Sequence, residues 1–271
     1  MLKVTLRAAL GALIAVMAVL ATPALAFDHQ PWDDLLQAHV SEHRDGVASA
    51  VDYDGMAADQ AALDDYLARL SAVDNDAFKD FSDDQKLAFL INAYNAFTVK
   101  LILKQDSRPD SIRDIGSIFS GPWSQRFFTL LGEERTLDEL EHQMIRGNPS
   151  LMDPRIHFAV NCASVGCPAL RPEAYPGEWL DAQLADSTRR FLSDRRRNRY
   201  DAEAGVLRVS SIFDWYQEDF EDSAGGLGDY LLQYADALAL PAEARRNLEA
   251  GDLPVRFLDY DWSLNTASNN P

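Results

Sequence analysis

Residues 80–104 constrain the fold most, because this stretch is apolar around almost its whole circumference when it is drawn as a helix. Ser82 and Gln85, three residues apart, form the pattern of a capping box that starts a helix. The large apolar residues behind it surround nearly the whole cylinder, and they are Leu87, Phe89, Leu90, Ile91, Tyr94, Phe97, Val99, Leu101 and Ile102. A helix that is apolar on all sides is buried. We therefore predict a core helix, ending before Pro109, around which the rest of the chain packs.

The other segments predict short elements that do not alternate as strand–helix–strand units. Helical patterns cover 32–39, 59–70, 136–146, 177–197, 211–220, 227–238 and 241–250. Extended patterns cover 47–53, 127–131, 156–161, a hairpin at 200–210 and a last strand at 255–260. This order predicts an α+β fold, mainly helical, with one domain and a small antiparallel sheet.

The N-terminal residues have the three parts of a secretory signal peptide. Lys3 and Arg7 precede the apolar run 8–20, and Ala24-Leu25-Ala26 is a cleavage pattern. We expect residues 1–26 to be removed, which leaves a periplasmic or secreted protein with no stable membrane span. The expected organisation is then an N-terminal helical extension (27–79), a main domain (80–265) and a flexible tail (266–271).

The formal net charge of −18 restricts the partners of the protein. Such a charge repels nucleic acids and anionic membrane surfaces, and it favours cationic ligands. The simplest interpretation is a surface of solvated carboxylates. We expect a small-molecule or peptide substrate and no nucleic-acid partner.

The segment 155–170 holds both cysteines of the chain, Cys162 and Cys167. Just before them, apolar residues alternate with His157, Ala159 and Asn161, which predicts a half-buried strand with His157 and Asn161 on one face. The chain then enters a turn rich in small residues. A histidine and an amide beside a thiol at a strand end make this segment a candidate for chemistry.

Three interpretations of the cysteine pair remain open. A disulfide would close a tight loop and stabilise the fold by roughly 2 kcal/mol. Alternatively, Cys162 or Cys167 is a nucleophile, and His157 or His142 is the base that lowers its pKa. The third interpretation is a metal site built from both cysteines and a histidine, although the chain lacks a second recognisable ligand pair, so no metal ligand is assigned.

Polar residues inside apolar patterns supply the remaining candidates. Glu141 falls in the middle of the apolar stripe of helix 136–146, with His142 at its edge, so it needs a partner such as a histidine or an arginine. It forms either a structural pair or the group that orients a catalytic histidine. Asn92 and Asn95 lie inside the buried helix and need partners too. They either bond to the main chain of other segments or bind a substrate amide, and Asn161 is a candidate oxyanion donor.

The usual cofactor and nucleophile motifs are missing from the sequence. It has no glycine-rich phosphate loop, no H-E-x-x-H and no G-x-S-x-G. We therefore expect no cofactor.

Four segments together resemble the domain-of-unknown-function family 547: FLINAYNAFTVKLIL (89–103), LDELEHQMIRG (137–147), RIHFAVNCASVGCPAL (155–170) and FLDYDWSLN (257–265). Similar proteins have been suspected to be thiol hydrolases related to cysteine peptidases. That resemblance implies Cys162 or Cys167 as nucleophile, His142 or His157 as base and Glu141 as orienter. The histidines precede the cysteines here, whereas papain-like enzymes have the opposite order.

The sequence thus supports three hypotheses. The first is an exported thiol-dependent hydrolase or acyl-transferase that acts on amide or ester bonds. The second is a non-catalytic cell-envelope binding or assembly domain made rigid by a Cys162–Cys167 disulfide. The third is a Cys/His metal-binding protein.

Overall fold

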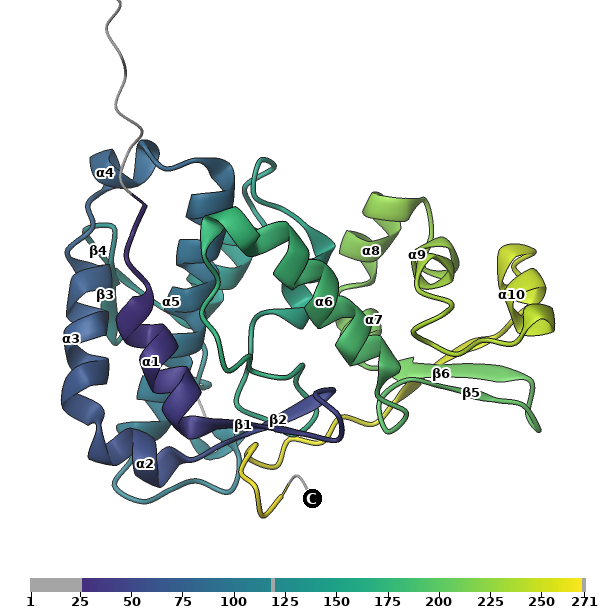
Figure 1. The fold of residues 1–271 in the computed structure, drawn as a ribbon, viewed down its shortest axis with the longest axis horizontal. Helices are drawn as coiled ribbons and strands as arrows, with labels where there is room; N and C mark the ends of the chain where they lie inside the picture. The colour runs from purple at the N-terminus through teal and green to yellow at the C-terminus, as the bar shows by residue number, and fades with distance from the viewer. Residues whose placement is uncertain (1–25, 118–119, 270–271) are drawn as a thin grey trace, which may run out of the picture.

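A computed structural model describes residues 26–117 and 120–269, so the predicted signal segment lies outside the described residues except for Ala26 (Figure 1). The first half contains α1 (Gln30–His39), β1 (Val40–His43), β2 (Ala48–Val51), α2 (Tyr53–Ala58), α3 (Gln60–Ser71), α4 (Asn75–Lys79), α5 (Asp83–Leu103) and η1 (Ile112–Asp114). The middle contains β3 (Phe128–Leu130), β4 (Glu133–Arg135), η2 (Glu139–Ile145), η3 (Pro154–Phe158), η4 (Gly177–Trp179) and α6 (Leu180–Ser193). The last part contains β5 (Arg199–Asp201), β6 (Val206–Ser210), α7 (Ile212–Trp215), α8 (Gln217–Ala224), α9 (Leu227–Gln233), α10 (Ala242–Glu249) and β7 (Val255–Leu258).

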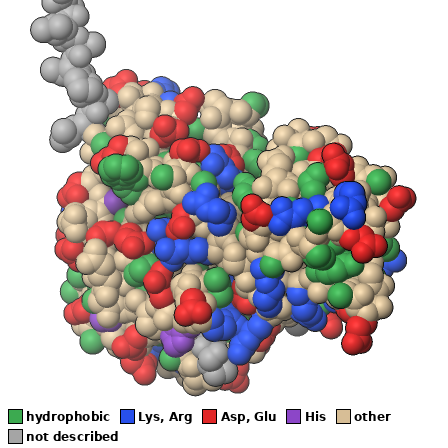
Figure 2. Space-filling view, turned by 45° about the vertical axis from the view of Figure 1, so that its right-hand side comes forward, with side chains coloured by type: hydrophobic (Ala, Val, Ile, Leu, Met, Phe, Trp, Pro, Cys, Tyr) green, Lys and Arg blue, Asp and Glu red, His purple; other side chains and the backbone are tan. Residues whose placement is uncertain are grey.

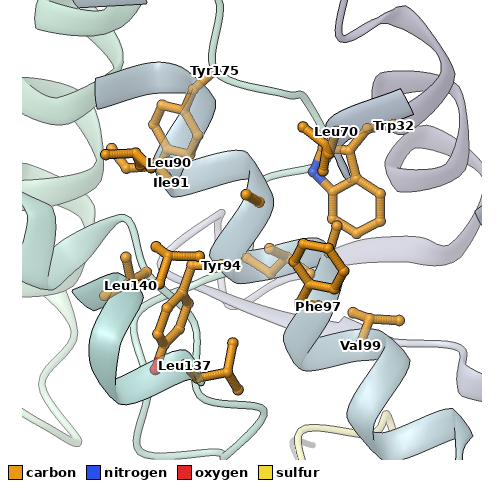
Figure 3. Close-up of a cluster of buried hydrophobic side chains, with 14 of the residues drawn as sticks. Trp32, Leu70, Leu90, Ile91, Tyr94, Phe97, Val99, Leu137, Leu140 and Tyr175 are labelled. Atoms are coloured by element: carbon orange, nitrogen blue, oxygen red, sulfur yellow. The ribbon is translucent and has the colours of Figure 1, made fainter. Parts of the chain in front are cut away.

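The predicted core helix is α5, and its capping box is present as expected. The Ser82 hydroxyl accepts from the Gln85 N–H, and the Gln85 side chain accepts from the Ser82 N–H. Figure 3 shows α5 packed on one side by Trp32 and Leu70 and on another by Leu137, Leu140 and Tyr175. Within the described residues, α5 is the one helix long and apolar enough to cross a membrane, but 83% of its most apolar window is buried by the rest of the protein. It is therefore the centre of a protein core.

The described chain has two apolar clusters, and the elements that carry most of each lie on the two sides of α6 in Figure 1. The first surrounds α5 and takes residues from α1 and α3. The second lies among α6 to α10 and contains Phe158, Phe191, Phe213 and Phe220. After β7 the chain returns to the first cluster, where Leu264 is buried and bridges to Ser164. The C-terminal segment is thereby placed against the cysteine loop.

The structure confirms a mainly helical α+β fold with small sheets. The pairs β1–β2 and β3–β4 are antiparallel hairpins, and the third sheet has the order β5-β6-β7. The β6–β7 pair is parallel, unlike the antiparallel sheet expected from the sequence. Such a pairing requires a long connection, which α7 to α10 provide.

The predicted strand at 156–161 is wrong. Pro154 to Phe158 form the short helix η3, which begins where the Asp153 carboxylate accepts from the Arg155 N–H. The alternation has a different cause, because Ile156 belongs to the first apolar cluster and Phe158 to the second. Successive apolar residues are therefore buried in two different cores, without any strand pairing.

Two predicted helices differ in detail from the structure. Thr136 and Glu139 form a capping box, but the helix after them has π geometry, with the Arg146 N–H donating to the Glu141 carbonyl at 3.0 Å. The predicted helix 211–220 is divided at Tyr216 into α7 and α8. Both irregularities lie next to the candidate site, as π geometry often does.

Candidate functional site

A pocket of about 220 Å³ lies where η2, η3, the cysteine loop, α7 and the returning C-terminal segment meet. Glu141, His142, His157 and Cys162 all line it. Four of the five residues that the sequence singled out as catalytic are therefore brought together from three segments, namely η2, η3 and the cysteine loop. The fifth, Cys167, lies behind the wall and is 2% exposed.

His157 is held by a charged pair that the sequence did not reveal. Its Nε2 lies 2.7 Å from a carboxylate oxygen of Asp219 on α8, and Arg146 donates two hydrogen bonds to the same carboxylate. Partial burial raises the pKa of Asp219, but the hydrogen bonds from His157 and Arg146 outweigh this effect and lower it to about 2. Asp219 is therefore an anion, and it accepts a hydrogen bond from the Nε2–H of His157.

The other ring nitrogen of His157, Nδ1, is buried and has no hydrogen-bond partner among the described residues. The ring stacks on Tyr216, with centroids 3.8 Å apart. Burial lowers the pKa of His157, despite the opposing bond to Asp219, so the ring is neutral at pH 7. A neutral ring with a carboxylate on one nitrogen and a lone pair on the other has the arrangement of a general base.

His142 is less suited to that role. Its side chain is 41% exposed, and Arg146 already donates to its Nδ1 at 3.0 Å. Its Nε2 lies 4.0 Å from Asp138. The two candidate bases thus differ, and His157 is the one that keeps an unbonded lone pair.

Glu141 is buried, and its partners are tyrosines rather than the histidine or arginine expected from the sequence. The Tyr216 hydroxyl donates to it at 2.6 Å, and the Tyr94 hydroxyl also bonds to it. Burial, reinforced by this carboxylate, raises the pKa of both tyrosines. The orienter of His157 is therefore Asp219, and Glu141 is a separate carboxylate in the pocket wall.

The cysteine loop contains a Cys162–Cys167 disulfide. Cys162 is half-buried and lines the pocket, whereas Cys167 is buried. Two main-chain N–H groups, those of Cys162 and Ser164, point to the Cys167 Sγ at 3.0 and 3.4 Å. The Tyr260 hydroxyl lies 3.2 Å from the Cys162 sulfur and 3.3 Å from the Cys167 sulfur. In this oxidised state neither sulfur is a nucleophile.

The three asparagines bond to the main chain and do not line the pocket. Asn92 bonds to both the N–H and the carbonyl of Tyr175, and Asn95 joins the Ala159 carbonyl to the Asn161 N–H. Asn161 accepts from the Ala163 N–H and donates to the Pro168 carbonyl. All three are buried. Their role in the structure is to hold the cysteine loop and the segment before η4 against α5.

Several residues of the site were missed by sequence reasoning. Asp219, Tyr216 and Tyr260 lie far from the cysteines in the chain, and aromatic residues such as those around them are the ordinary material of an apolar core. The remaining aromatic wall consists of Trp123, Trp215 and Trp262. The closing motif that contains Tyr260 and Trp262 was a signal, but its contact with the cysteine loop exists only in the folded chain.

The described residues contain no group of three or more His, Cys, Asp or Glu side chains that could hold a metal ion. The structure therefore lends no support to the Cys/His metal-binding hypothesis.

Comparison with protein-family models gave a match, whereas comparison with individual proteins did not. Neither the curated proteins nor the solved structures contain one that matches the chain. Residues 78–192 match the model of a family described as protein of unknown function, DUF547. This segment contains α5, η2, η3 and the cysteine loop, whereas Tyr216, Asp219 and Tyr260 lie beyond it. The matched segment supplies Glu141, both pocket histidines and the disulfide, and it is this segment that is similar to the DUF547 family.

Proposed function

We propose that the protein is an exported, thiol-dependent hydrolase or acyl-transferase that acts on amide or ester bonds when its disulfide is reduced. The observation that carries this proposal is the position of Cys162. It lines the same pocket as His157, and the Asp219 carboxylate orients that ring. Cysteine is also the strongest nucleophile type among the residues of this wall.

Release of the Cys162 thiol requires a dithiol reductant. A reductant thiolate attacks one sulfur, the S–S bond breaks, and the second reductant thiol then displaces the mixed disulfide, so that the reductant is oxidised and both cysteines become thiols. Cys162 is the accessible sulfur. The two main-chain N–H groups on the Cys167 Sγ favour a negative charge there, so Cys167 is the better leaving group.

In the reduced protein the proposed reaction has two steps. The His157 Nδ1 takes the proton of Cys162, and the thiolate attacks the carbonyl carbon. The bond to the leaving amine or alcohol then breaks, and the imidazolium protonates that group. Water or an acceptor cleaves the thioester in the second step. Tyr260, whose hydroxyl is 3.2 Å from the Cys162 sulfur, is the nearest side-chain donor for the oxyanion.

The test combines labelling with an acyl donor. The mature chain is reduced with dithiothreitol, freed of reductant and treated with p-nitrophenyl acetate, and the adduct is located by mass spectrometry. We expect acylation of Cys162 in the wild type and in Cys167→Ser, and none in Cys162→Ser. His157→Gln should slow the acylation burst and abolish the dependence of its rate on a group that titrates below pH 6.5. His142→Gln is the matched control and should keep both the wild-type rate and its pH dependence. An equal effect of the two histidine variants, or acylation that is indifferent to Cys162→Ser, would contradict the proposal.

The disulfide itself favours a second candidate, a non-catalytic cell-envelope binding or assembly domain. In that case the Cys162–Cys167 bond only makes the loop rigid. This second candidate predicts that the reduced protein forms no acyl adduct. It also predicts that Cys162→Ser and Cys167→Ser lower stability equally and have no other effect.

A further inference from the structure

The outer wall of the pocket is a connected group of aromatic side chains. Tyr260 and Trp262 have centroids 4.5 Å apart, Trp215 lies 4.7 Å from Tyr260 and 5.5 Å from Trp262, and Trp123 lies 5.8 Å from Trp262. Trp215 is 46% exposed, which is unusual for a tryptophan with two aromatic neighbours in the same pocket. An aromatic group that lines a pocket and remains partly open to solvent is typical of a recognition surface.

The inner wall carries two carboxyl groups, those of Glu141 and Asp138, and neither forms an ion pair with a lysine or arginine of the described residues. Glu141 is 6% exposed, and its hydrogen-bond partners are neutral hydroxyls. Asp138 also lines the pocket, at 4.0 Å from the His142 Nε2. Arg146 is the nearest cation, but its guanidinium is bonded to Asp219 and to His142. None of the described residues that line the pocket is a lysine or an arginine.

Two aromatic rings that line the pocket, those of Trp262 and Tyr216, already attract cations within the protein. The Arg113 guanidinium lies 5.1 Å from the ring centre of Trp262, and Arg146 lies 5.0 Å from that of Tyr216. Both distances are within the range of cation–π attraction. No arginine or lysine in the described part of the chain is placed in this way on Trp123, Trp215 or Tyr260, so these rings are available to a ligand.

We infer that the pocket is a subsite for a cationic group, an alkylated or primary ammonium, on the substrate. That the bound cation is part of a substrate rests on the proposed function, whereas the binding of a cation to the pocket does not. A volume of about 220 Å³ suits a headgroup or a side chain rather than a larger ligand. The aromatic walls supply ring faces, and Glu141 and Asp138 supply the charge. The net charge of −18 attracts the same kind of ligand from a distance.

A neutral apolar group would contact the same rings but would gain nothing from the carboxylates. Choline and 3,3-dimethylbutan-1-ol separate the two cases, since they have the same shape and differ in the positive charge. Three of the five tryptophans line the pocket, so the intrinsic fluorescence of the oxidised, full mature chain reports occupancy.

We expect choline to bind at least about tenfold more tightly than its neutral isostere. Glu141→Gln should remove most of this difference without weakening the isostere. Asp138→Asn, at a partly exposed position, is the second charge variant and should reduce the preference in part. Trp179→Leu is the control, because this exposed tryptophan does not line the pocket.

Equal affinities for choline and the isostere, or a preference that survives both charge variants, would overturn the inference. So would the failure of choline to change the fluorescence of a folded protein. Because binding is measured with the disulfide intact, these outcomes leave the acylation of Cys162 untouched. Conversely, a protein that binds choline but is never acylated would retain the subsite and lose the proposed function.

Discussion

At the scale of single residues, the main finding is that His157 is oriented by Asp219 and not by Glu141. The two carboxylates have different surroundings. Asp219 bonds to Arg146 and His157, whereas Glu141 bonds to tyrosine hydroxyls. A carboxylate with cationic and N–H partners stays ionised at low pH and can fix the tautomer of a histidine. The hydrogen bonds of Glu141 come from neutral hydroxyls and bring no positive charge to the pocket.

Replacing Asp219 with Asn should affect both stability and chemistry. The change removes the negative charge that Arg146 and His157 face, so we expect a loss of about 2 kcal/mol in the free energy of unfolding. In the reduced protein it should also slow the acylation of Cys162, because Nδ1 is no longer kept as the free base. Urea denaturation and the acylation burst measure the two effects. Asp222→Asn, on the exposed side of the same helix, should change neither.

At the scale of elements, buried asparagines connect α5 to loops far away in the chain. Asn92 holds the segment at Tyr175, and Asn95 holds the chain at 159–161 just before Cys162. Each amide satisfies a main-chain donor and a main-chain acceptor that would otherwise be buried without partners. This requirement explains why two poor helix formers occupy the middle of the most apolar helix.

Asn95→Ala should therefore be costly. It leaves the Ala159 carbonyl and the Asn161 N–H without partners, and we expect the free energy of unfolding to fall by about 2–4 kcal/mol. Ser82→Ala, which removes only the exposed cap of the same helix, should cost about 1 kcal/mol. Urea unfolding curves of the two variants provide the comparison. Equal losses would mean that the amide bonds contribute little to the connection.

At the scale of the whole molecule, the disulfide is a small part of the total stability. It closes a loop between residues 162 and 167, and a loop of this length contributes only about 2 kcal/mol. We therefore expect the reduced protein to remain folded, with a modest decrease in its urea midpoint and unchanged far-ultraviolet circular dichroism. Cys162→Ser/Cys167→Ser should reproduce that decrease. Unfolding on reduction would exclude the reduced form as the active one.

The pH dependence of stability has a definite sign. The pKa of His157 is lowered mainly by burial, burial lowers the pKa of His29 from 6.5 to about 4, and the pKa of Asp219 is lowered from 3.8 to about 2. For each group the unfolded chain binds a proton at a higher pH than the folded chain does. Their contribution is complete above pH 6.5 and is lost as the pH falls toward 2. The urea midpoint should therefore decrease between pH 7 and pH 4, and His29→Gln should flatten that decrease.

Surface charge is the other property of the whole molecule. Asp and Glu side chains are scattered over the face in Figure 2, whereas Lys and Arg gather toward its middle. Two of the six arginines in segment 189–199 form ion pairs, since Arg190 bonds to Glu42 and Asp186, and Arg197 bonds to Asp194. These two arginines therefore have a structural role.

The sequence by itself determined the elements whose signals are local. The all-round apolarity of α5 predicted its burial, the Ser82–Gln85 capping box predicted where it begins, and the cysteine spacing made a disulfide one of the interpretations. These features depend on neighbours within a few residues. By contrast, only the tertiary structure decided the partner of His157, the tyrosines on Glu141 and the short helix in place of the strand at 156–161. Residues 62 to 98 positions apart meet in this pocket, and their contacts depend on how two cores pack against one segment, which no local pattern encodes.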